Sequence, residues 1–139
     1  MAQIELNWLG AQRYLAIDSK GHTVLLSPPN DIGIKPSEGL LVALAACSAY
    51  DVVEITQKQR AKLQALKVFV TSEQAKEAPW RYQKIHLTYQ ITAEGTNQAK
   101  LERNVDLALN QYCSVRASLH PEIAVTFEVV LQSTPPVVE

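Results

Sequence analysis

The stretch PSEGLLVALAAC, residues 36–47, decides the fold, and no glycine or proline follows it before Leu63. Pro36 suits the first turn of a helix, and Glu38 is placed to interact with the positive end of the helix dipole. A helix from Pro36 to about Leu63 would be roughly 40 Å long. Because its first half is apolar on nearly all sides, we expect a central, buried helix.

Strand patterns flank this helix on both sides. Three short alternating segments precede it and predict an antiparallel meander, and a proline-containing loop (27–33) leads into the helix. Two longer strands, a second helix and a final strand follow it. The expected ranges are strands 3–9, 13–17, 22–26, 65–72, 81–92 and 123–131, a helix from residues 96–98 onwards with room for a short extra turn after Cys113, and a polar tail over 133–139.

The order β-β-β-α-β-β-α-β predicts one α+β domain over residues 1–139, with mainly antiparallel sheets around the long helix. The alternation of strands and helices that is typical of nucleotide-binding folds is absent, as are a glycine-rich phosphate loop and a GxSxG motif. At 139 residues, with 47% hydrophobic and 19% charged side chains, the chain is long enough for one sizeable core.

Net charge and targeting signals indicate which partners and which cellular compartment to expect. A formal net charge of −1 gives no electrostatic reason to expect nucleic acid or an acidic membrane surface as a partner. No uninterrupted apolar run of about 18 residues is present to span a bilayer. The N-terminus lacks the basic start and apolar core of a signal peptide, so we expect a cytoplasmic protein.

Cys47 and Cys113 are the only two cysteines, and each lies in a segment that we expect to be a buried amphipathic helix. The pair contains no CxxC motif and the three histidines are scattered, so the sequence does not predict a metal site. In a reducing cytosol both cysteines would remain thiols, and a disulfide between them would be transient and catalytic rather than structural.

The expected helix face around Cys47 is apolar toward the N-terminus and acidic toward the C-terminus. Asp51 and Glu54 would by themselves disfavour a thiolate, because like charges repel. A reactive Cys47 would therefore need a cation from elsewhere in the chain. The candidates are Arg13, Arg81 and Arg116. The alternative is that Cys47 is a small core residue and that the charged residues form a solvated helix end.

The helix face around Cys113 carries Asp106, Leu109 and Asn110, with Arg116 one turn later if the helix continues. Arg116 could lower the pKa of the thiol or orient an oxyanion. A cysteine that packs like valine beside a surface arginine explains the same pattern.

Two motifs resemble one known family. Residues 36–41 leading to Ala45-Ala46-Cys47 and then Asp51-Val52-Val53-Glu54-Ile55 are similar to the central-helix motif of the OsmC/Ohr family, the osmotically inducible and organic-hydroperoxide-resistance proteins. Residues 84–89 match a strand of that family, and residues 110–115 match its second-cysteine segment. The resemblance extends from about Gln3 to Leu131, and the combination of both cysteine segments makes it specific.

The resemblance implies a thiol peroxidase that works as an intertwined homodimer, with active sites at the subunit interface. By position, Cys47 would be the peroxidatic thiol and Cys113 the resolving thiol, and an external dithiol would reduce their disulfide. No metal, flavin or haem would be needed. The apolar face beside Cys47 would suit a small organic hydroperoxide better than hydrogen peroxide.

One departure from the family pattern places the chain nearer the OsmC-like branch than the Ohr branch. The Ohr branch has a glutamate directly after the proline, paired with an arginine, whereas this chain has Ser37 there and Glu38 one residue later. One position turns a helical side chain by about 100°, so Glu38 faces a different direction from a glutamate placed directly after the proline. The resemblance implies an activating arginine in the N-terminal hairpin region, and Arg13 is the only arginine in the expected N-terminal strands. Two other functions stay open: a non-catalytic protein that binds a small apolar or acyl ligand at the dimer interface, and a redox sensor.

Overall fold

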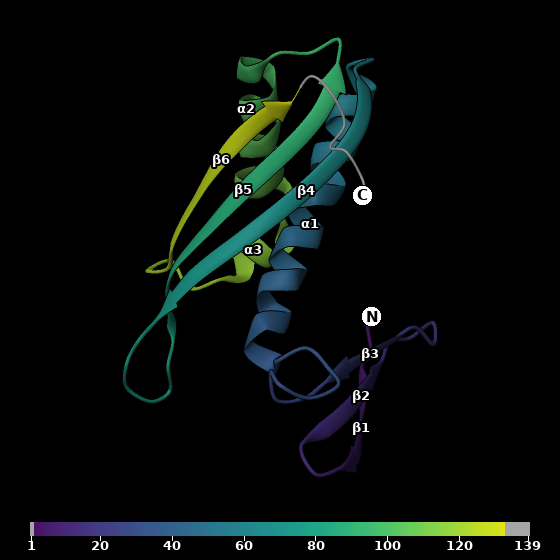
Figure 1. Cartoon of the computed structure of the whole chain (residues 1–139), viewed down its shortest axis with the longest axis vertical. Helices are drawn as coiled ribbons and strands as arrows, with labels where there is room; N and C mark the ends of the chain where they lie inside the picture. Colours follow the sequence, from purple (N-terminus) through teal and green to yellow (C-terminus); the bar gives the residue numbers. More distant parts are fainter. Residues whose placement is uncertain (1, 133–139) are drawn as a thin grey trace. The chain divides into compact units, whose positions relative to one another are not determined.

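A computed structural model of the chain describes residues 2–132, so the predicted tail at 133–139 lies outside the described residues. The predicted order of strands and helices is confirmed (Figure 1). The elements are β1 (Glu5–Gly10), β2 (Arg13–Ile17), β3 (Thr23–Leu26), α1 (Pro36–Lys58), β4 (Lys62–Gln74), β5 (Tyr82–Glu94), α2 (Gln98–Leu107), the π-helix η1 (Ala108–Tyr112), α3 (Ser114–Ser118) and β6 (Ala124–Gln132).

The chain divides into two compact units, residues 1–42 and residues 43–139, each of which is described by itself. The N-terminal unit contains the predicted meander, an antiparallel sheet in the order β1-β2-β3. After β3 the chain folds back, and Ile34 donates a backbone hydrogen bond to the carbonyl of Leu25 (3.0 Å). A Cβ atom at Gly33 would lie 2.7 Å from the Leu25 backbone, so this close approach requires glycine.

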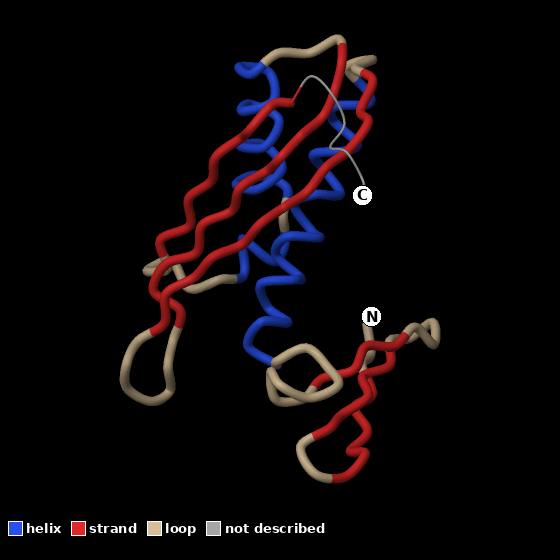
Figure 2. The backbone as a smooth tube through the Cα atoms, viewed as in Figure 1, coloured by secondary structure: helices blue, strands red, loops and turns tan. Residues whose placement is uncertain are grey.

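The C-terminal unit contains a second sheet, in the order β4-β5-β6, with α1 and α2 on one of its faces (Figures 1 and 2). β4 and β5 are antiparallel, whereas β6 runs parallel to β5, so this sheet is mixed. The parallel pairing requires a crossover connection, which α2, η1 and α3 supply. Alternate residues of β5 face the helices and form the centre of the core, namely Ile85, Leu87, Tyr89 and Ile91.

α1 differs from its prediction in length and in burial. It ends at Lys58 rather than near Leu63, because Arg60 adopts a left-handed conformation (φ 64°) and its N–H bonds to the carbonyl of Gln57. Only one line of residues, spaced four apart, is buried: Leu44, Ser48, Val52 and Thr56. α1 thus contributes to the core as expected, but in the single chain only this one line of its surface is buried.

By length and composition alone, α1 would be long and apolar enough to cross a membrane. It packs its buried line into the core of the C-terminal unit, as a core helix does.

The second helical region is interrupted before Cys113. α2 begins at the cap Asn97, whose side chain accepts a hydrogen bond from the N–H of Lys100 (2.9 Å). It passes into η1, and Cys113 itself is extended (φ −76°, ψ 109°) before α3 begins. The expectation that Cys113 lies inside a helix is therefore wrong, because the regular helix ends at Leu107 and the wider π-helix that follows ends at Tyr112.

A buried polar cluster joins α2 to α1 and gives a stability prediction. Asn104 is 1% exposed; its Nδ2 donates to Gln59 Oε1 (2.9 Å) and Thr56 Oγ1 (3.2 Å), and its Oδ1 accepts from Gln59 Nε2 (3.0 Å). We expect Asn104→Ala to lower the free energy of unfolding by about 2 kcal/mol, because buried partners lose their hydrogen bonds. Urea denaturation measures the change. The exposed neighbour Arg103 provides a control, and Arg103→Ala should change stability by no more than about 0.5 kcal/mol. Equal effects of the two substitutions would contradict the prediction.

Candidate active site

Cys47 lies on α1 in the C-terminal unit and is partly exposed. The next residue, Ser48, belongs to the buried line of the helix, so Cys47 lies at the margin between the core and solvent. Its sulfur is 3.8 Å from the hydroxyl oxygen of Ser114, the first residue of α3. α1 and α3 therefore meet at Cys47.

Cys113 is buried (2% exposed) and caps the N-terminus of α3. Its sulfur accepts a hydrogen bond from the backbone N–H of Arg116 (3.4 Å). The first N–H groups of a helix lack partners within the helix, so they are available to atoms placed at its end. The backbone N–H groups of Val115 and Ser114, in the same turn, lower the pKa of Cys47.

The two thiols have opposite pKa shifts. The hydrogen bond from the Val115 N–H lowers the pKa of Cys47 below its ordinary value and outweighs the opposing effect of burial; hydrogen bonds with the Cys113 and Ser114 side chains lower it further. Burial raises the pKa of Cys113, and so does the hydrogen bond with Cys47, while the Arg116 N–H opposes both effects. Cys47 is therefore the thiol of the pair that loses its proton first, and its thiolate is stabilised while Cys113 keeps its proton.

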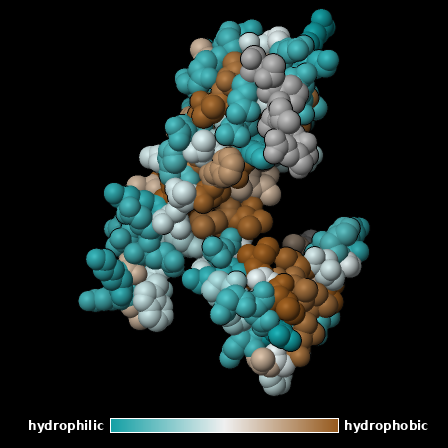
Figure 3. Space-filling model, viewed as in Figure 1, coloured by the Kyte–Doolittle hydropathy of each residue, from teal (hydrophilic) through white to brown (hydrophobic). Residues whose placement is uncertain are grey.

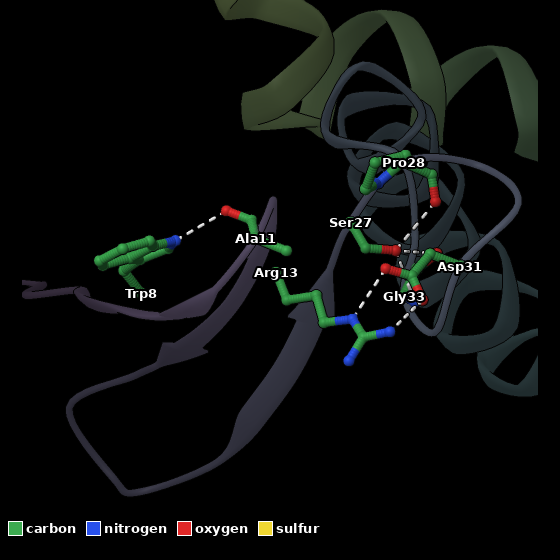
Figure 4. A network of polar contacts seen from close by, with 7 residues as sticks. All are labelled: Trp8, Ala11, Arg13, Ser27, Pro28, Asp31 and Gly33. Atoms are coloured by element: carbon green, nitrogen blue, oxygen red, sulfur yellow. Dashed lines mark hydrogen bonds and ion pairs between the residues drawn. The ribbon is translucent and has the colours of Figure 1, made fainter.

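The arginines expected to activate Cys47 are engaged elsewhere or contribute through the backbone. Arg13, in the N-terminal unit, forms a two-pronged ion pair with Asp31 (2.8 and 2.9 Å; Figure 4). Arg81 pairs with Glu122 (2.9 Å). Arg116 contributes its N–H, and within residues 2–132 its Nε, although buried, has no hydrogen-bond partner. None of these three side chains is among the groups that shift the pKa of either thiol.

None of the acidic candidates Glu38, Asp51 and Glu54 is among the groups that shift the pKa of Cys47. Glu38 is exposed in the first turn of α1, within the N-terminal unit. Glu54 pairs with Lys58 one turn further along α1 (3.0 Å). Asp51 is partly buried on the same helix. In the described part of the chain, no three histidine, cysteine or acidic side chains gather in a group that could hold a metal ion.

The buried hydroxyl groups of Ser48 and Tyr89 were not among the candidate residues expected from the sequence. Ser48 and Tyr89 are both fully buried, and their hydroxyl oxygens are 2.6 Å apart. Burial, together with the charge of Cys113, raises the pKa of Tyr89 to about 12, although the hydrogen bond with Ser48 opposes the rise. Tyr89 therefore interacts electrostatically with Cys113 and stays protonated. The available signal was a serine directly after Cys47 on the line Leu44, Ser48, Val52 and Thr56, where a core helix usually carries apolar residues.

The fold and the paired thiols define an α+β protein with a dithiol centre where α1 meets the start of α3. Residues 28–128 match the family of OsmC-like proteins, and the chain belongs to that family. The family resemblance found in the sequence is thus confirmed.

Three relatives illustrate the match. Protein YhfA of Escherichia coli strain K12 is 34% identical over 131 residues, which cover 92% of this chain and 98% of YhfA. The OsmC-like protein of Mycoplasma pneumoniae has the same fold at 17% identity (TM-score 0.82, covering 94% of this chain and 96% of that one). The organic hydroperoxide resistance protein OhrB of Bacillus subtilis shares the fold at 15% identity (TM-score 0.63, covering 93% and 97%).

The opposite pKa shifts of the thiols lead to a prediction about their reactivity. We expect Cys47, studied in Cys113→Ser, to reach its plateau rate with iodoacetamide at a lower pH than Cys113, studied in Cys47→Ser. A thiol reacts as its thiolate, so its rate rises with pH until deprotonation is complete, and a lowered pKa moves that rise to lower pH. Alkylation rates over a pH series test the order. Coincident or reversed profiles would contradict the assignment of Cys47 as the more acidic thiol.

Proposed function

We propose that this protein is a thiol-dependent peroxidase that reduces organic hydroperoxides through a Cys47 sulfenic acid and a Cys47–Cys113 disulfide. One observation carries the proposal: partly exposed Cys47 has a lowered pKa, buried Cys113 has a raised one, and a hydrogen bond with the other thiol is among the causes of both shifts. An accessible thiolate can attack, and a second thiol near it can resolve the product.

The reaction balances with these two thiols and a reductant. The Cys47 thiolate attacks the terminal oxygen of R–O–OH, the O–O bond breaks, and the alkoxide takes a proton to leave as an alcohol. Cys47 is now a sulfenic acid. The sulfur of Cys113 then attacks the sulfur of Cys47, the S–O bond breaks, and the hydroxyl leaves with a proton as water. An external dithiol reduces the disulfide by thiol–disulfide exchange and returns both thiols.

A homodimer forms part of the proposal, and exposed apolar surface supports it. In α1, Tyr50 is 73% exposed, and with Ala46, Ala49 and Val53 it lines a hollow of about 470 Å³. In the N-terminal unit, Ile4, which precedes β1, and Leu6 and Trp8 within β1 lie at alternate positions and are all more than half exposed. Figure 3 shows apolar side chains gathered over this unit. Apolar surface of this kind marks protein–protein contacts, and a second copy of the chain is the partner that we propose.

The remaining assignments follow from the same proposal. We place the protein in the cytoplasm, where dithiol reductants keep cysteines reduced, and we treat residues 1–139 as one functional domain. Arg13, Glu38, Asp51, Glu54 and Arg116 remain proposed supporting residues, because groups from a partner chain complete the site in an interface enzyme. The reaction as written uses no metal or organic cofactor.

Thiol counting on addition of stoichiometric tert-butyl hydroperoxide tests the function. We expect both thiols to disappear together and mass spectrometry to show one disulfide that joins Cys47 to Cys113. Dithiothreitol should restore both thiols and allow further turnover. Thiols that stay unchanged in the presence of the hydroperoxide would refute the peroxidase proposal and would favour the non-catalytic ligand-binding alternative.

A further inference from the structure

The hydroxyl group of Ser114 lies beside the sulfur of Cys47. The two residues are 67 positions apart in the chain, and their Oγ and Sγ atoms are 3.8 Å apart, within hydrogen-bond range for a sulfur atom. Ser114 is exposed and Cys47 is partly exposed, so a small molecule that reaches this sulfur also meets the hydroxyl. Within residues 2–132, the Ser114 hydroxyl makes no hydrogen bond to any other group.

The backbone around Ser114 fixes this placement. Cys113 is extended, and its sulfur accepts a hydrogen bond from the N–H of Arg116 (3.4 Å), which closes the first turn of α3 around Ser114. The carbonyl of Cys113 also accepts a hydrogen bond from the N–H of Ala117 (3.0 Å). Because the backbone is held in this way, only the side chain of Ser114 is left to rotate, and its hydroxyl can turn its proton toward Cys47 or away from it.

The direction of this hydrogen bond depends on the charge of Cys47. Either atom can be the donor while Cys47 is a thiol, but a thiolate has no proton, so Ser114 must then donate. The Ser114 side chain is accordingly among the groups that lower the pKa of Cys47. When the thiolate attacks R–O–OH, its negative charge passes to the alkoxy oxygen, and a donor that can rotate is able to follow that charge.

We propose that Ser114 is a catalytic residue whose hydroxyl turns from the Cys47 sulfur to the departing alkoxy oxygen and passes it the proton that makes the alcohol. The inference rests on the proposed peroxidase function. In this step the sulfur electron pair forms the S–O bond, the O–O bond breaks, and the electron pair of that bond goes to the alkoxy oxygen. Ser114 gives this oxygen its proton and regains one from solvent, to which it is exposed. Cys47 is thereby oxidised to the sulfenic acid and the hydroperoxide is reduced to the alcohol.

Two peroxides that differ in their leaving group test this role. The alkoxide that leaves tert-butyl hydroperoxide is strongly basic and needs a proton, whereas peracetic acid releases acetate, which leaves as a stable anion. We expect Ser114→Ala to slow the first turnover with tert-butyl hydroperoxide by about tenfold or more, and the first turnover with peracetic acid by at most about twofold. Stopped-flow measurements at a pH above the midpoint of Cys47 alkylation keep the thiolate population equal in both proteins. Ser114→Thr, which keeps the hydroxyl, should restore the rate with tert-butyl hydroperoxide.

Ser118→Ala is the matched control, because Ser118 is an exposed serine of the same helix whose hydroxyl donates to a backbone carbonyl (2.8 Å) rather than to a sulfur. It should leave both rates unchanged. Equal slowing with the two peroxides in Ser114→Ala, or slowing with neither, would overturn the inference, while the peroxidase function would stand on the turnover of the parent. A parent that reacts with neither peroxide would refute the peroxidase function and, with it, the role of Ser114.

Discussion

Replacing Cys47 with serine is expected to lower the rate of organic hydroperoxide consumption by about 1,000-fold or more, since the reaction then lacks its nucleophile. A serine hydroxyl is protonated at neutral pH, and the Val115 N–H that lowers the pKa of Cys47 cannot turn it into an alkoxide. Cys113 cannot replace Cys47, because it is buried and burial raises its pKa. Stopped-flow measurement of hydroperoxide loss, with the thiol count of the product, checks the result.

Cys113→Ser is the matched control, because it removes the other thiol and leaves the proposed nucleophile. We expect this variant to consume about one hydroperoxide per chain and then to stop at the sulfenic acid, which dimedone should trap on Cys47. No intramolecular disulfide can form. If Cys47→Ser consumed hydroperoxide as fast as the parent, or if dimedone marked Cys113 in the parent, the two roles would have been assigned wrongly.

Much of the fold could be predicted from local patterns. The alternation in the β1–β3 region, the long uninterrupted segment after Pro36 and the two long strands that follow are short-range signals, and all of them correspond to observed elements. The end of α1 could not be predicted, because Arg60 takes a left-handed conformation without glycine. The direction of β6 also depends on a long-range crossover that no local pattern encodes.

The candidate site could be predicted from the sequence only in part. Cys47 and Cys113 could be identified as a pair from the sequence, and a cationic side chain was expected to activate Cys47. In the structure the group that lowers the pKa of Cys47 most is the backbone N–H of Val115 in α3, and backbone donors carry no residue-type signal. This N–H is available because η1 ends the preceding helix and leaves Cys113 extended, so that α3 begins beside Cys47.

The exposed face of α1 gives a second large prediction, which concerns assembly. We expect the parent to elute at twice the 15.4 kDa of one chain and Tyr50→Asp to elute as a monomer at micromolar concentration. Tyr50 is 73% exposed in the single chain, so the substitution should disturb little within one copy. In a symmetric dimer each change occurs twice, and two desolvated carboxylates should raise the dissociation constant by about 100-fold or more.

Phe69 provides a matched control for this assembly test. It is a large apolar residue, 52% exposed, and the register places it on the face of the β4–β6 sheet opposite Tyr89, away from the helices. Phe69→Asp should therefore remain dimeric. A monomeric parent, or dissociation by both substitutions alike, would contradict α1 as the contact surface. If Tyr50→Asp is monomeric and also loses hydroperoxide turnover while Cys47 still reacts with Ellman's reagent, then the partner chain supplies part of the hydroperoxide site, as an interface enzyme requires.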